Sequence, residues 1–369
     1  MSIALIAHYL GPSLGIGQYL DRLIPPLIHE LKLKNIETVI LASPNAKEKT
    51  PALDTVDAQI LTLPSLDYSP TKRLIWFTLS FPSFCQKNGI TGVIWLSNPI
   101  ILPWHPPSIG VLHDVNEWKM GKKYGYLKTT LRSLIYLDSS LKFAKKIIAI
   151  SEATYNDILN FRSNSQLQDK LMIISNGANS SLINLPPVEI SAPKNPFLLS
   201  VGRIDPEGKN LPEAVNFTKA LRQISGQSWE LHIIGGMNAS SQNKGEAFLK
   251  SIKSFDWVTY HGYVDNNSLA QWYRQATAII FLSNNEGFGF PIAEASSFCK
   301  WSVVSDQNQA AFEAGGSSLI FIDINDPKNS AIKVLEELKQ EKPPLVELPQ
   351  WEDSAKLYTE AILSLVIGH

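Results

Sequence analysis

The chain has 369 residues, more than one hydrophobic core usually serves, so two domains are expected. Its composition, 44% hydrophobic and 18% charged, is that of an ordinary globular protein. A formal net charge of −1 gives no global reason to expect nucleic acid as a partner.

The remaining bulk features point to a soluble cytoplasmic protein. Cys85 and Cys299 lie far apart and belong to no metal-binding pattern, so both are expected to be buried in a reducing compartment. The N-terminus lacks the basic segment of a signal peptide, and no apolar run approaches the roughly 18 residues of a membrane span.

The first hundred residues begin as a doubly wound sheet. Ile3–His8 predicts a buried strand, Gln18–Lys34 a helix and Glu37–Ala42 a second strand, which is the βαβ opening of such a fold. The glycine-rich loop before the helix is not a dinucleotide fingerprint, because Leu20 stands where the last glycine would be required.

A histidine follows a later strand of the same sheet. Gly92–Leu96 and Ser108–Leu112 predict strands, and the second runs into His113-Asp114. A lone histidine is by default structural, but ligands of α/β proteins bind at the carboxyl ends of parallel strands. Both interpretations of His113 stay open, and Asp114 is expected to orient the loop or the histidine.

The segment Lys119–Lys146 is strongly basic, with eight Lys or Arg residues against one acid, Asp138. Leucines at helical spacing predict an amphipathic helix over Tyr126–Lys146. One interpretation is a solvated basic face over a core-facing leucine stripe. The other is attraction to an anionic bilayer, where each basic residue contributes on the order of 1 kcal/mol. The leucines are Leu127, Leu131, Leu134 and Leu141.

A proline-rich stretch separates the two expected domains. The first domain closes with a strand at Ile147–Ser151, a helix from Glu152 and a strand at Leu171–Ser175. Four prolines then fall between residues 178 and 196 with little periodicity, which is typical of a linker. The expected organisation is an N-terminal domain over 1–178, a linker over 179–196, a second domain over 197–350 and a C-terminal helix over 351–369.

The second domain opens with two basic residues in one turn. Phe197–Val201 predicts a buried strand, and the turn after it contains Gly202, Arg203 and Lys209. A basic residue in such a turn is often only solvated. Two of them after a parallel strand suit a diphosphate better.

The stretch Ala278–Lys300 carries the most specific signal. It begins with an apolar run that predicts a strand, continues through a glycine loop, and Pro291 then opens a helix. Such a helix N-terminus favours an anion. Glu286 and Glu294 bracket the loop, eight positions apart, and each alone is explained by favourable charge near the helix start.

The complete pattern, Glu, Gly-Phe-Gly-Phe-Pro and Glu, resembles the E-x7-E signature of retaining glycosyltransferases of family four, also described as glycosyl transferases group 1. Three further segments are similar in order and spacing: Gly15-Ile16-Gly17, His113-Asp114 and Arg203 to Asn210. The resemblance implies an α/β protein of the GT-B fold, with two Rossmann-like doubly wound domains facing across a cleft. It implies that the first domain is the acceptor side and the second the nucleotide-sugar donor side, and that the C-terminal helix returns to the first domain.

The implied activity is transfer of a hexose, with retention, from a nucleotide-diphosphate sugar to an acceptor hydroxyl in polysaccharide, glycolipid or glycoconjugate synthesis. By resemblance, Arg203 and Lys209 grip the leaving diphosphate, Glu286 contacts sugar hydroxyls and Glu294 accepts the ribose hydroxyls. The implied catalytic residues are His113, Arg203, Lys209 and Glu286. The implied donor-binding residues are Gly15, Gly17, Gly202, Arg203, Lys209, Tyr263, Val264, Glu286, Gly287, Phe288, Gly289, Phe290 and Glu294.

The sequence departs from the family pattern in two places. Leu14-Gly15 replaces the usual glycine pair before the first helix, and Ala311-Phe312-Glu313 replaces Pro-Glu followed by Val. No D-x-D occurs, so neither a metal nor a cofactor is expected, and the positive groups are expected to carry the charge of the leaving group.

Two other functions remain open. One is a sugar-nucleotide epimerase on the same fold, for which no second acid or base can be assigned beside His113. The other is a non-catalytic partner subunit that binds no donor. The expected partners of the enzyme are a nucleotide sugar and a sugar or lipid-linked acceptor, with possible peripheral contact to an anionic membrane through Lys119–Lys146.

Overall fold

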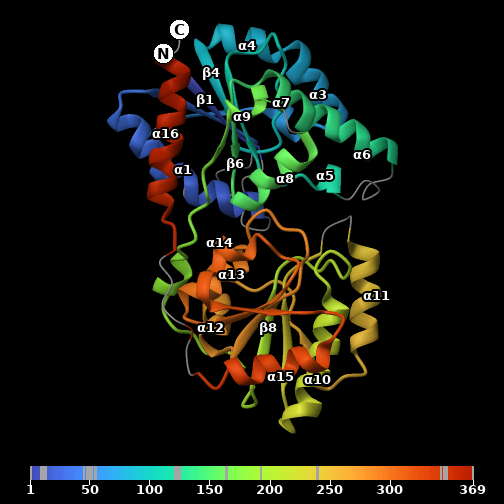
Figure 1. The fold of residues 1–369 in the computed structure, drawn as a ribbon. Helices are drawn as coiled ribbons and strands as arrows, with labels where there is room; N and C mark the ends of the chain where they lie inside the picture. Colours follow the sequence, from blue (N-terminus) through green and yellow to red (C-terminus); the bar gives the residue numbers. More distant parts are fainter. Residues whose placement is uncertain are drawn as a thin grey trace. The chain divides into compact units, whose positions relative to one another are not determined.

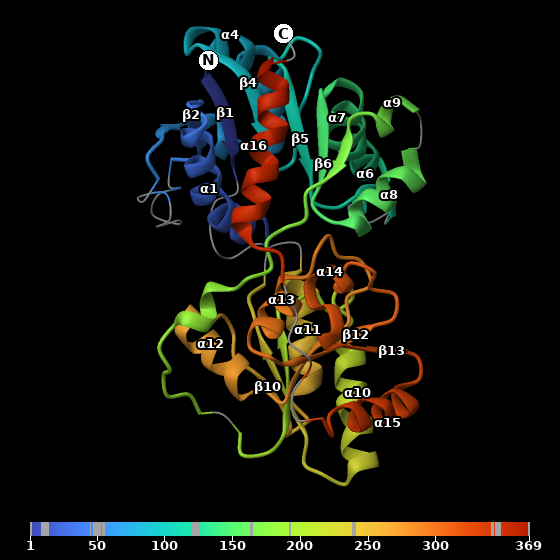
Figure 2. The same ribbon diagram turned by 60° about the vertical axis from the view of Figure 1, so that its left-hand side comes forward.

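The computed structural model describes residues 2–8, 15–44, 46, 53, 56–119, 126–162, 165–191, 193–237, 241–340, 343 and 348–367. The chain forms two compact units, shown as ribbons in Figures 1 and 2. The first unit comprises Met1–Gly177 together with Pro349–His369, and the second comprises Ala178–Leu348.

The first unit is built on a seven-stranded parallel sheet in the order β3-β2-β1-β4-β5-β6-β7. Its strands are β1 (Ser2–Ala7), β2 (Glu37–Ala42), β3 (Gln59–Thr62), β4 (Ile90–Trp95), β5 (Ser108–Leu112), β6 (Lys146–Ala149) and β7 (Leu171–Ile173). Its helical segments are α1 (Gly15–Leu33), η2 (Pro64–Asp67), α3 (Pro70–Leu79), α4 (Phe81–Lys87), α5 (Asn116–Lys119), α6 (Tyr126–Arg132), η3 (Ser133–Asp138), α7 (Ser139–Phe143), α8 (Glu152–Arg162), α9 (Ser165–Gln168) and α16 (Trp351–Ile367).

Helices cover both faces of this sheet because alternate strand residues point to opposite sides. On one face α3 and α4 contribute Phe77, Phe81 and Cys85 to the core, and burial raises the pKa of the Cys85 thiol to about 12. On the other face α1 packs against α16, which Figures 1 and 2 both show. The buried hydroxyls of Tyr19 and Tyr358 meet there at 2.8 Å. The C-terminal helix is thereby fixed to the first unit.

The basic segment of this unit differs from the single amphipathic helix expected there. Over Tyr126–Lys146 the chain forms α6, a π-helical segment η3 and α7, which ends at Phe143, and Lys146 is the first residue of β6. A π-helical turn holds an extra residue, so it rotates the leucine stripe away from the core. Leu131 and Leu134 are 55% and 57% exposed, so the expectation that they face the core is wrong. Leu141 does pack against the core, and the side chain of Leu127 lies outside the described residues.

The second unit is built on a six-stranded parallel sheet in the order β10-β9-β8-β11-β12-β13. Its strands are β8 (Phe197–Val201), β9 (Glu230–Ile234), β10 (Val258–Tyr260), β11 (Ala278–Phe281), β12 (Trp301–Ser305) and β13 (Leu319–Ile322). Its helical segments are η4 (Ser181–Asn184), α10 (Leu211–Ser225), α11 (Gln242–Ile252), α12 (Asn266–Gln275), α13 (Phe290–Ser297), α14 (Ala311–Gly315), η5 (Gly316–Ser318) and α15 (Pro327–Glu337).

This sheet is also covered on both faces. Leu198 of β8 belongs to a core shared with α10, α11 and α15. Its neighbour Phe197 points the other way, where its ring lies 5.7 Å from that of Trp272 on α12. Cys299, just past α13, is partly exposed, so the expected burial of both cysteines holds only for Cys85.

The segment 179–196, interpreted from the sequence as a linker, is packed on the second unit. Its helical turn η4 contacts α12. The guanidinium of Arg274 on α12 donates hydrogen bonds to the carbonyls of Ile183 and Leu185, at 3.1 and 2.6 Å. Prolines remove the regular pattern of this segment without freeing it from the domain.

In the part of the chain that the structure describes, no helix combines the length and the apolar character that crossing a bilayer requires.

Candidate active site

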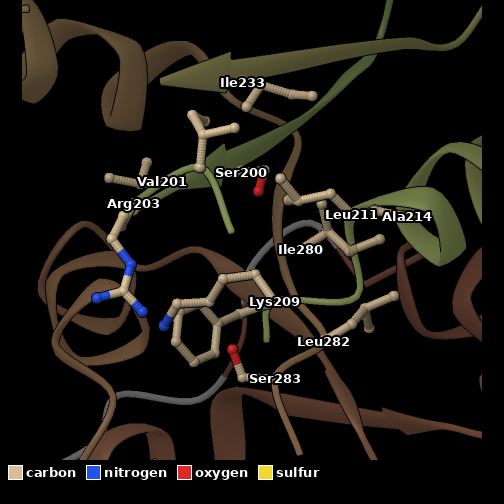
Figure 3. A pocket seen from close by; sticks show the side chains of 13 residues that line it. Ser200, Val201, Arg203, Lys209, Leu211, Ala214, Ile233, Ile280, Leu282 and Ser283 are labelled. Carbon is tan, nitrogen blue, oxygen red and sulfur yellow. The ribbon is translucent and has the colours of Figure 1, made fainter. Parts of the chain in front are cut away.

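A hollow lies where the second sheet changes direction. From β8 the chain builds β9 and β10 on one side, then crosses to place β11 on the other side of β8. Ligands of open α/β sheets bind at such a switch point, at the carboxyl ends of the strands. The hollow encloses about 320 Å³, open solvent included. Its lining, drawn in Figure 3, is Ser200, Val201, Gly202, Arg203, Ile204, Lys209, Leu211, Ala214, Ile233, Ile280, Phe281, Leu282 and Ser283.

The backbone around this hollow uses conformations that restrict the residue type. Gly235, with φ of 149°, passes so close to Gly202 that a Cβ there would lie 1.8 Å from the Gly202 carbonyl oxygen. Asn210, with φ of 48°, is left-handed at the start of α10, a conformation that asparagine tolerates better than most residues. Its amide donates to the Leu282 carbonyl at 2.8 Å, which ties the start of α10 to the end of β11.

The charged groups of the hollow are paired. The Lys209 ammonium donates to the Glu286 carboxylate, and both side chains are 20% exposed. The same ammonium lies 4.8 Å from the centre of the Phe281 ring. The Arg203 guanidinium donates to Asp205 at 2.8 Å. In Figure 3 the side chains of Arg203 and Lys209 extend toward the same side of the hollow.

Helix α13 begins beside this cluster. Gly289 precedes it in a left-handed conformation with φ of 104°, and Pro291 occupies its first turn, as the sequence predicts. The unpaired amides of such a start and the positive end of the helix dipole favour an anion. Glu294 is only 2% exposed, and its carboxylate accepts a hydrogen bond of 2.9 Å from Tyr273 on α12. It therefore lies inside the unit, under the helix start.

Of the remaining donor-binding candidates of this unit, Gly202 lines the hollow and the others do not. Phe288 is buried, and its ring lies 5.3 Å from that of Phe290. Tyr263 is 64% exposed in the loop after β10, and Val264 follows it. The departure at Ala311-Phe312 falls in α14, where Phe312 is 61% exposed and stacks near Phe321, with ring centres 4.7 Å apart.

His113 belongs to the first unit, directly after β5. Its Nε2 lies 2.8 Å from the Leu96 carbonyl, which can only accept, so Nε2 carries a proton. The ring of Tyr19 meets the imidazole edge-on at 4.6 Å. Burial lowers the pKa of His113 to about 4, against the opposing effect of the Leu96 hydrogen bond. His113 is therefore neutral near pH 7, which suits a hydrogen-bonding role better than that of a charged acid.

The glycine loop of the first unit is only partly described. Gly15 and Gly17 form the first turn of α1, where Gly15 is exposed and Gly17 is buried. Leu14, the departure from the family pattern, lies outside the described residues.

Three residues that position the charged groups were not among the sequence candidates: Asp205, Asn210 and Tyr273. Asp205 holds Arg203 and also accepts from the Gly208 amide at 3.3 Å. Asn210 appears in the sequence pattern only as the last residue of the segment from Arg203 to Asn210. Tyr273 lies on a helix far from Glu294 in sequence, and nothing in the local pattern links the two residues.

Comparison with known proteins agrees with this geometry. Residues 184–347 match the family described as "Glycosyl transferases group 1". The chain is 22% identical over 356 residues to the O-antigen chain mannosyltransferase B of Escherichia coli, covering 89% of this chain and 88% of that protein. It superposes on the sucrose-phosphate synthase of Thermosynechococcus elongatus with a TM-score of 0.67 at 18% identity, covering 100% and 97% of the two chains.

The same fold also carries another chemistry. The UDP-GlcNAc 2-epimerase of Methanocaldococcus jannaschii superposes with a TM-score of 0.61 at 14% identity, covering 98% of this chain and 99% of that one. Likeness at this level of identity concerns the fold alone. The two parallel sheets and these neighbours confirm the expected GT-B fold, and the segment 184–347, which contains the Lys209–Glu286 pair, matches the group 1 glycosyltransferase family.

Proposed function

We propose that this protein is a retaining glycosyltransferase that moves a hexose from a nucleotide-diphosphate sugar to an acceptor hydroxyl in the synthesis of a polysaccharide, glycolipid or related glycoconjugate. The observation that carries the proposal is the Lys209–Glu286 pair, with Arg203 in the same hollow, at the switch point of the family-matching unit. The mannosyltransferase relative supports the polysaccharide context.

Donor binding would exchange partners within this cluster. Without donor, Lys209 and Glu286 neutralise each other in a partly buried position. A diphosphate carries more negative charge than one carboxylate, so it competes for the Lys209 ammonium and for Arg203. Glu286 is then released to accept hydrogen bonds from hydroxyls of the transferred sugar. The cation is held in place before the donor arrives, so little reorganisation is required during the reaction.

The reaction proposed for this site breaks the bond between the anomeric carbon and the diphosphate oxygen. The electron pair of that bond leaves with the nucleoside diphosphate. The acceptor hydroxyl forms the new bond to the same face of the anomeric carbon, and its proton passes to the departing phosphate. Arg203, Lys209 and the amides at the start of α13 stabilise the growing charge, which is the role of preorganised donors in a transition state.

No metal ligand set is assigned to this reaction, because the chain contains no D-x-D and these groups supply positive charge themselves. Glu294 is proposed to accept the ribose hydroxyls of the donor, and backbone groups at Tyr263 and Val264 to contact the base. His113, neutral and fixed to Leu96, is proposed to hydrogen-bond the donor sugar from the first unit.

We also propose peripheral contact with an anionic membrane through the basic segment. Leu131, Leu134, Lys142 and Lys145 are all exposed on this segment, and apolar and basic side chains are the mixture that interfacial helices use. Not all of the positive charge is available, since Lys119 pairs with Asp157 at 2.5 Å and Arg132 with Glu117 at 2.8 Å. The apolar contribution is therefore expected to matter as much as the charge.

The test is a screen of nucleotide sugars, including UDP and GDP donors, with products followed by NMR spectroscopy. A transferase consumes the donor and releases the nucleoside diphosphate, slowly by hydrolysis even without acceptor, and transfer keeps the anomeric configuration. An epimerase instead converts one nucleotide sugar into another and releases no diphosphate. A partner subunit shows no thermal stabilisation by any nucleotide sugar, because a ligand stabilises only a protein that binds it. Either of these two results would reject the proposal.

Removal of metal ions by a chelator distinguishes the proposed metal-independent mechanism from a metal-dependent one. Turnover should survive EDTA. Loss of turnover that added magnesium or manganese restores would show that a metal carries part of the leaving-group charge.

A further inference from the structure

The first unit has a second hollow at the position equivalent to the donor hollow of the second unit. In its sheet the order changes direction between β1 and β4, as it does between β8 and β11 in the other sheet. A hollow of about 240 Å³, open solvent included, lies there, lined from the ends of both strands and from α3 and η3. Its lining residues are Ile6, His8, Arg73, Phe77, Trp95, Ser97, Asn98, Ile100 and Tyr136.

The positive charge in this hollow has no acidic partner among the described residues. The Arg73 guanidinium donates to Nε2 of His8 at 2.8 Å and to the Leu66 carbonyl at 3.2 Å. Because Nε2 accepts this bond, His8 is neutral, and burial together with the charge of Arg73 lowers its pKa to about 4. Asp67 interacts electrostatically with His8, but its side chain is exposed, where water screens it. The hollow thus keeps most of one positive charge.

Two polar hydrogens point to the same ligand chemistry. The hydroxyl of Ser97 and the indole Nε1 of Trp95 have no hydrogen-bond partner within the described part of the chain. These residues are 2% and 1% exposed. Both line the hollow, and a buried donor without a partner is costly unless something fills its place. Asn98, the residue after Ser97, has a left-handed backbone conformation with φ of 41°.

We propose that this hollow binds an oxyanion, a phosphate or a carboxylate, carried by the substrate of the first unit. Arg73 supplies the charge and a planar pair of donors, and the Ser97 hydroxyl and Trp95 Nε1–H supply two further donors. The assignment of this oxyanion to the glycosyl acceptor rests on the proposed function. The binding of the anion itself does not.

Trp95 gives a readout that is local to the hollow. The chain, which has nine tryptophans, is labelled with 5-fluorotryptophan, and the Trp95 resonance is assigned from a Trp95→Phe variant. Inorganic phosphate and acetate are titrated separately. The Trp95 resonance should shift saturably with at least one of them, and the stronger of the two identifies the anion as phosphate or carboxylate. The same shift should persist in Lys209→Ala, which excludes the donor hollow as its source.

Matched variants on α3 test whether the anion-dependent shift of the Trp95 resonance requires Arg73. Arg73→Gln should weaken anion binding at least tenfold. Lys72→Gln, which removes the exposed neighbouring charge on α3, should change it less than threefold. Arg73→Lys, which keeps the charge and loses the planar fork, should fall between them. Unchanged resonances of the tryptophans outside the hollow show that the free Arg73→Gln protein is folded, whereas the Trp95 resonance itself responds to the loss of a charge from the hollow.

Two results would overturn the inference. One is the absence of any saturable Trp95 shift in the wild-type protein, which would mean that water alone fills the hollow. The other is equal weakening by Arg73→Gln and Lys72→Gln. Donor consumption is measured on the same samples. A wild-type protein that turns over donor without a Trp95 response rejects only this inference. A protein that binds the anion through Arg73 but consumes no nucleotide sugar rejects only the proposed function.

Discussion

The two hollows of this molecule occupy the same topological position and differ in how their charge is balanced. In the hollow of the second unit both cations already have a carboxylate partner: Lys209 pairs with Glu286 and Arg203 with Asp205. In the first unit Arg73 donates to a neutral imidazole and a backbone carbonyl instead. One hollow is neutralised before a ligand arrives, and the other keeps its charge.

This difference teaches how each hollow can select its ligand. A paired cation is released only to a ligand that competes with its carboxylate, so weakly charged anions gain little there. A cation beside neutral groups attracts any oxyanion that fits the space, so the shape of the hollow determines which oxyanion binds. The second arrangement suits recognition of a group that takes no part in the chemistry. The first suits a group whose charge grows during the reaction.

The largest effect is expected in the hollow of the second unit, where both cations have carboxylate partners. Lys209→Ala should lower kcat by roughly 10²–10³, because the loss of one preorganised donor at a site of growing charge costs about 2.7–4 kcal/mol. Kinetics with the donor varied at saturating acceptor measure this, with Lys219→Ala on the next turns of α10 as a surface control. A kcat within a few-fold of the wild type would remove Lys209 from leaving-group stabilisation.

A conservative variant of Glu286 tests whether Lys209 exchanges its carboxylate partner for the donor diphosphate. Glu286→Gln keeps the size of the side chain but frees Lys209 from its ion pair, so inorganic anions should bind the second unit more tightly while sugar transfer falls. Thermal stabilisation by pyrophosphate measures the first effect. Weaker stabilisation than in the wild type would show that Glu286 positions Lys209 rather than competing with the donor.

A smaller effect is expected for the buried carboxylate beneath the helix start. Glu294→Ala should raise the donor KM roughly 10- to 100-fold with little change in kcat, since a hydrogen bond to a charged group contributes about 1.5–3 kcal/mol in the ground state and the transition state alike. Tyr273→Phe removes only the 2.9 Å hydrogen bond that orients this carboxylate, so its KM should rise less. A fall in kcat larger than the rise in KM would place Glu294 in the chemical step.

Much of this framework could be predicted from the sequence, because it depends on local signals. The strands at 37–42, 108–112 and 197–201 have the predicted bounds, since each is a short apolar run between turn residues. The glycine loop before α13 and the Lys209 turn carry side chains and backbone conformations that few sequences combine. These features located the hollow of the second unit.

The rest depended on contacts that no local pattern records. The π-helical segment η3 exposes Leu131 and Leu134, although their spacing is that of a buried stripe. No motif or spacing singles out Arg73 in the sequence, and only the fold places it beside His8, 65 positions away. The linker had few periodic residues, yet Arg274 fixes it to α12 through backbone carbonyls, which any sequence supplies.

The histidines of the first unit provide a pH test of its neutral environment. An unfolded histidine binds a proton below about pH 6.5, whereas folded His113 stays neutral until about pH 4. The unfolded state therefore binds more protons in this window, and the free energy of unfolding should decrease as the pH falls through it. His113→Gln, which can keep a donor near Leu96, should lose less stability between pH 7.5 and pH 5 in urea unfolding. An equal loss in both proteins would show that His113 titrates normally.

The smallest expected effect concerns the surface of the first unit rather than its hollow. Leu131 and Leu134 are exposed on the basic segment. Leu33 on α1, outside that segment, is 63% exposed between Lys34 and Lys32, and Lys32 pairs with Asp57. If the segment docks on a membrane, Leu131→Gln and Leu134→Gln should each weaken binding to anionic vesicles severalfold, because each removes apolar surface from the interface. Leu33→Gln should leave it unchanged.

Salt separates the apolar part of this contact from the electrostatic part. The screening length falls to about 3 Å at 1 M salt, so attraction of Lys142 and Lys145 to anionic lipids should largely vanish there. Because Lys119 and Arg132 already pair with acids, only part of the segment's charge contributes, and a weaker residual affinity carried by the leucines should remain. Sedimentation with neutral and anionic vesicles across a salt series measures both parts. Equal partition to the two vesicle types at low salt would leave the basic segment a solvated face, and the contrast between the units would then be confined to their hollows.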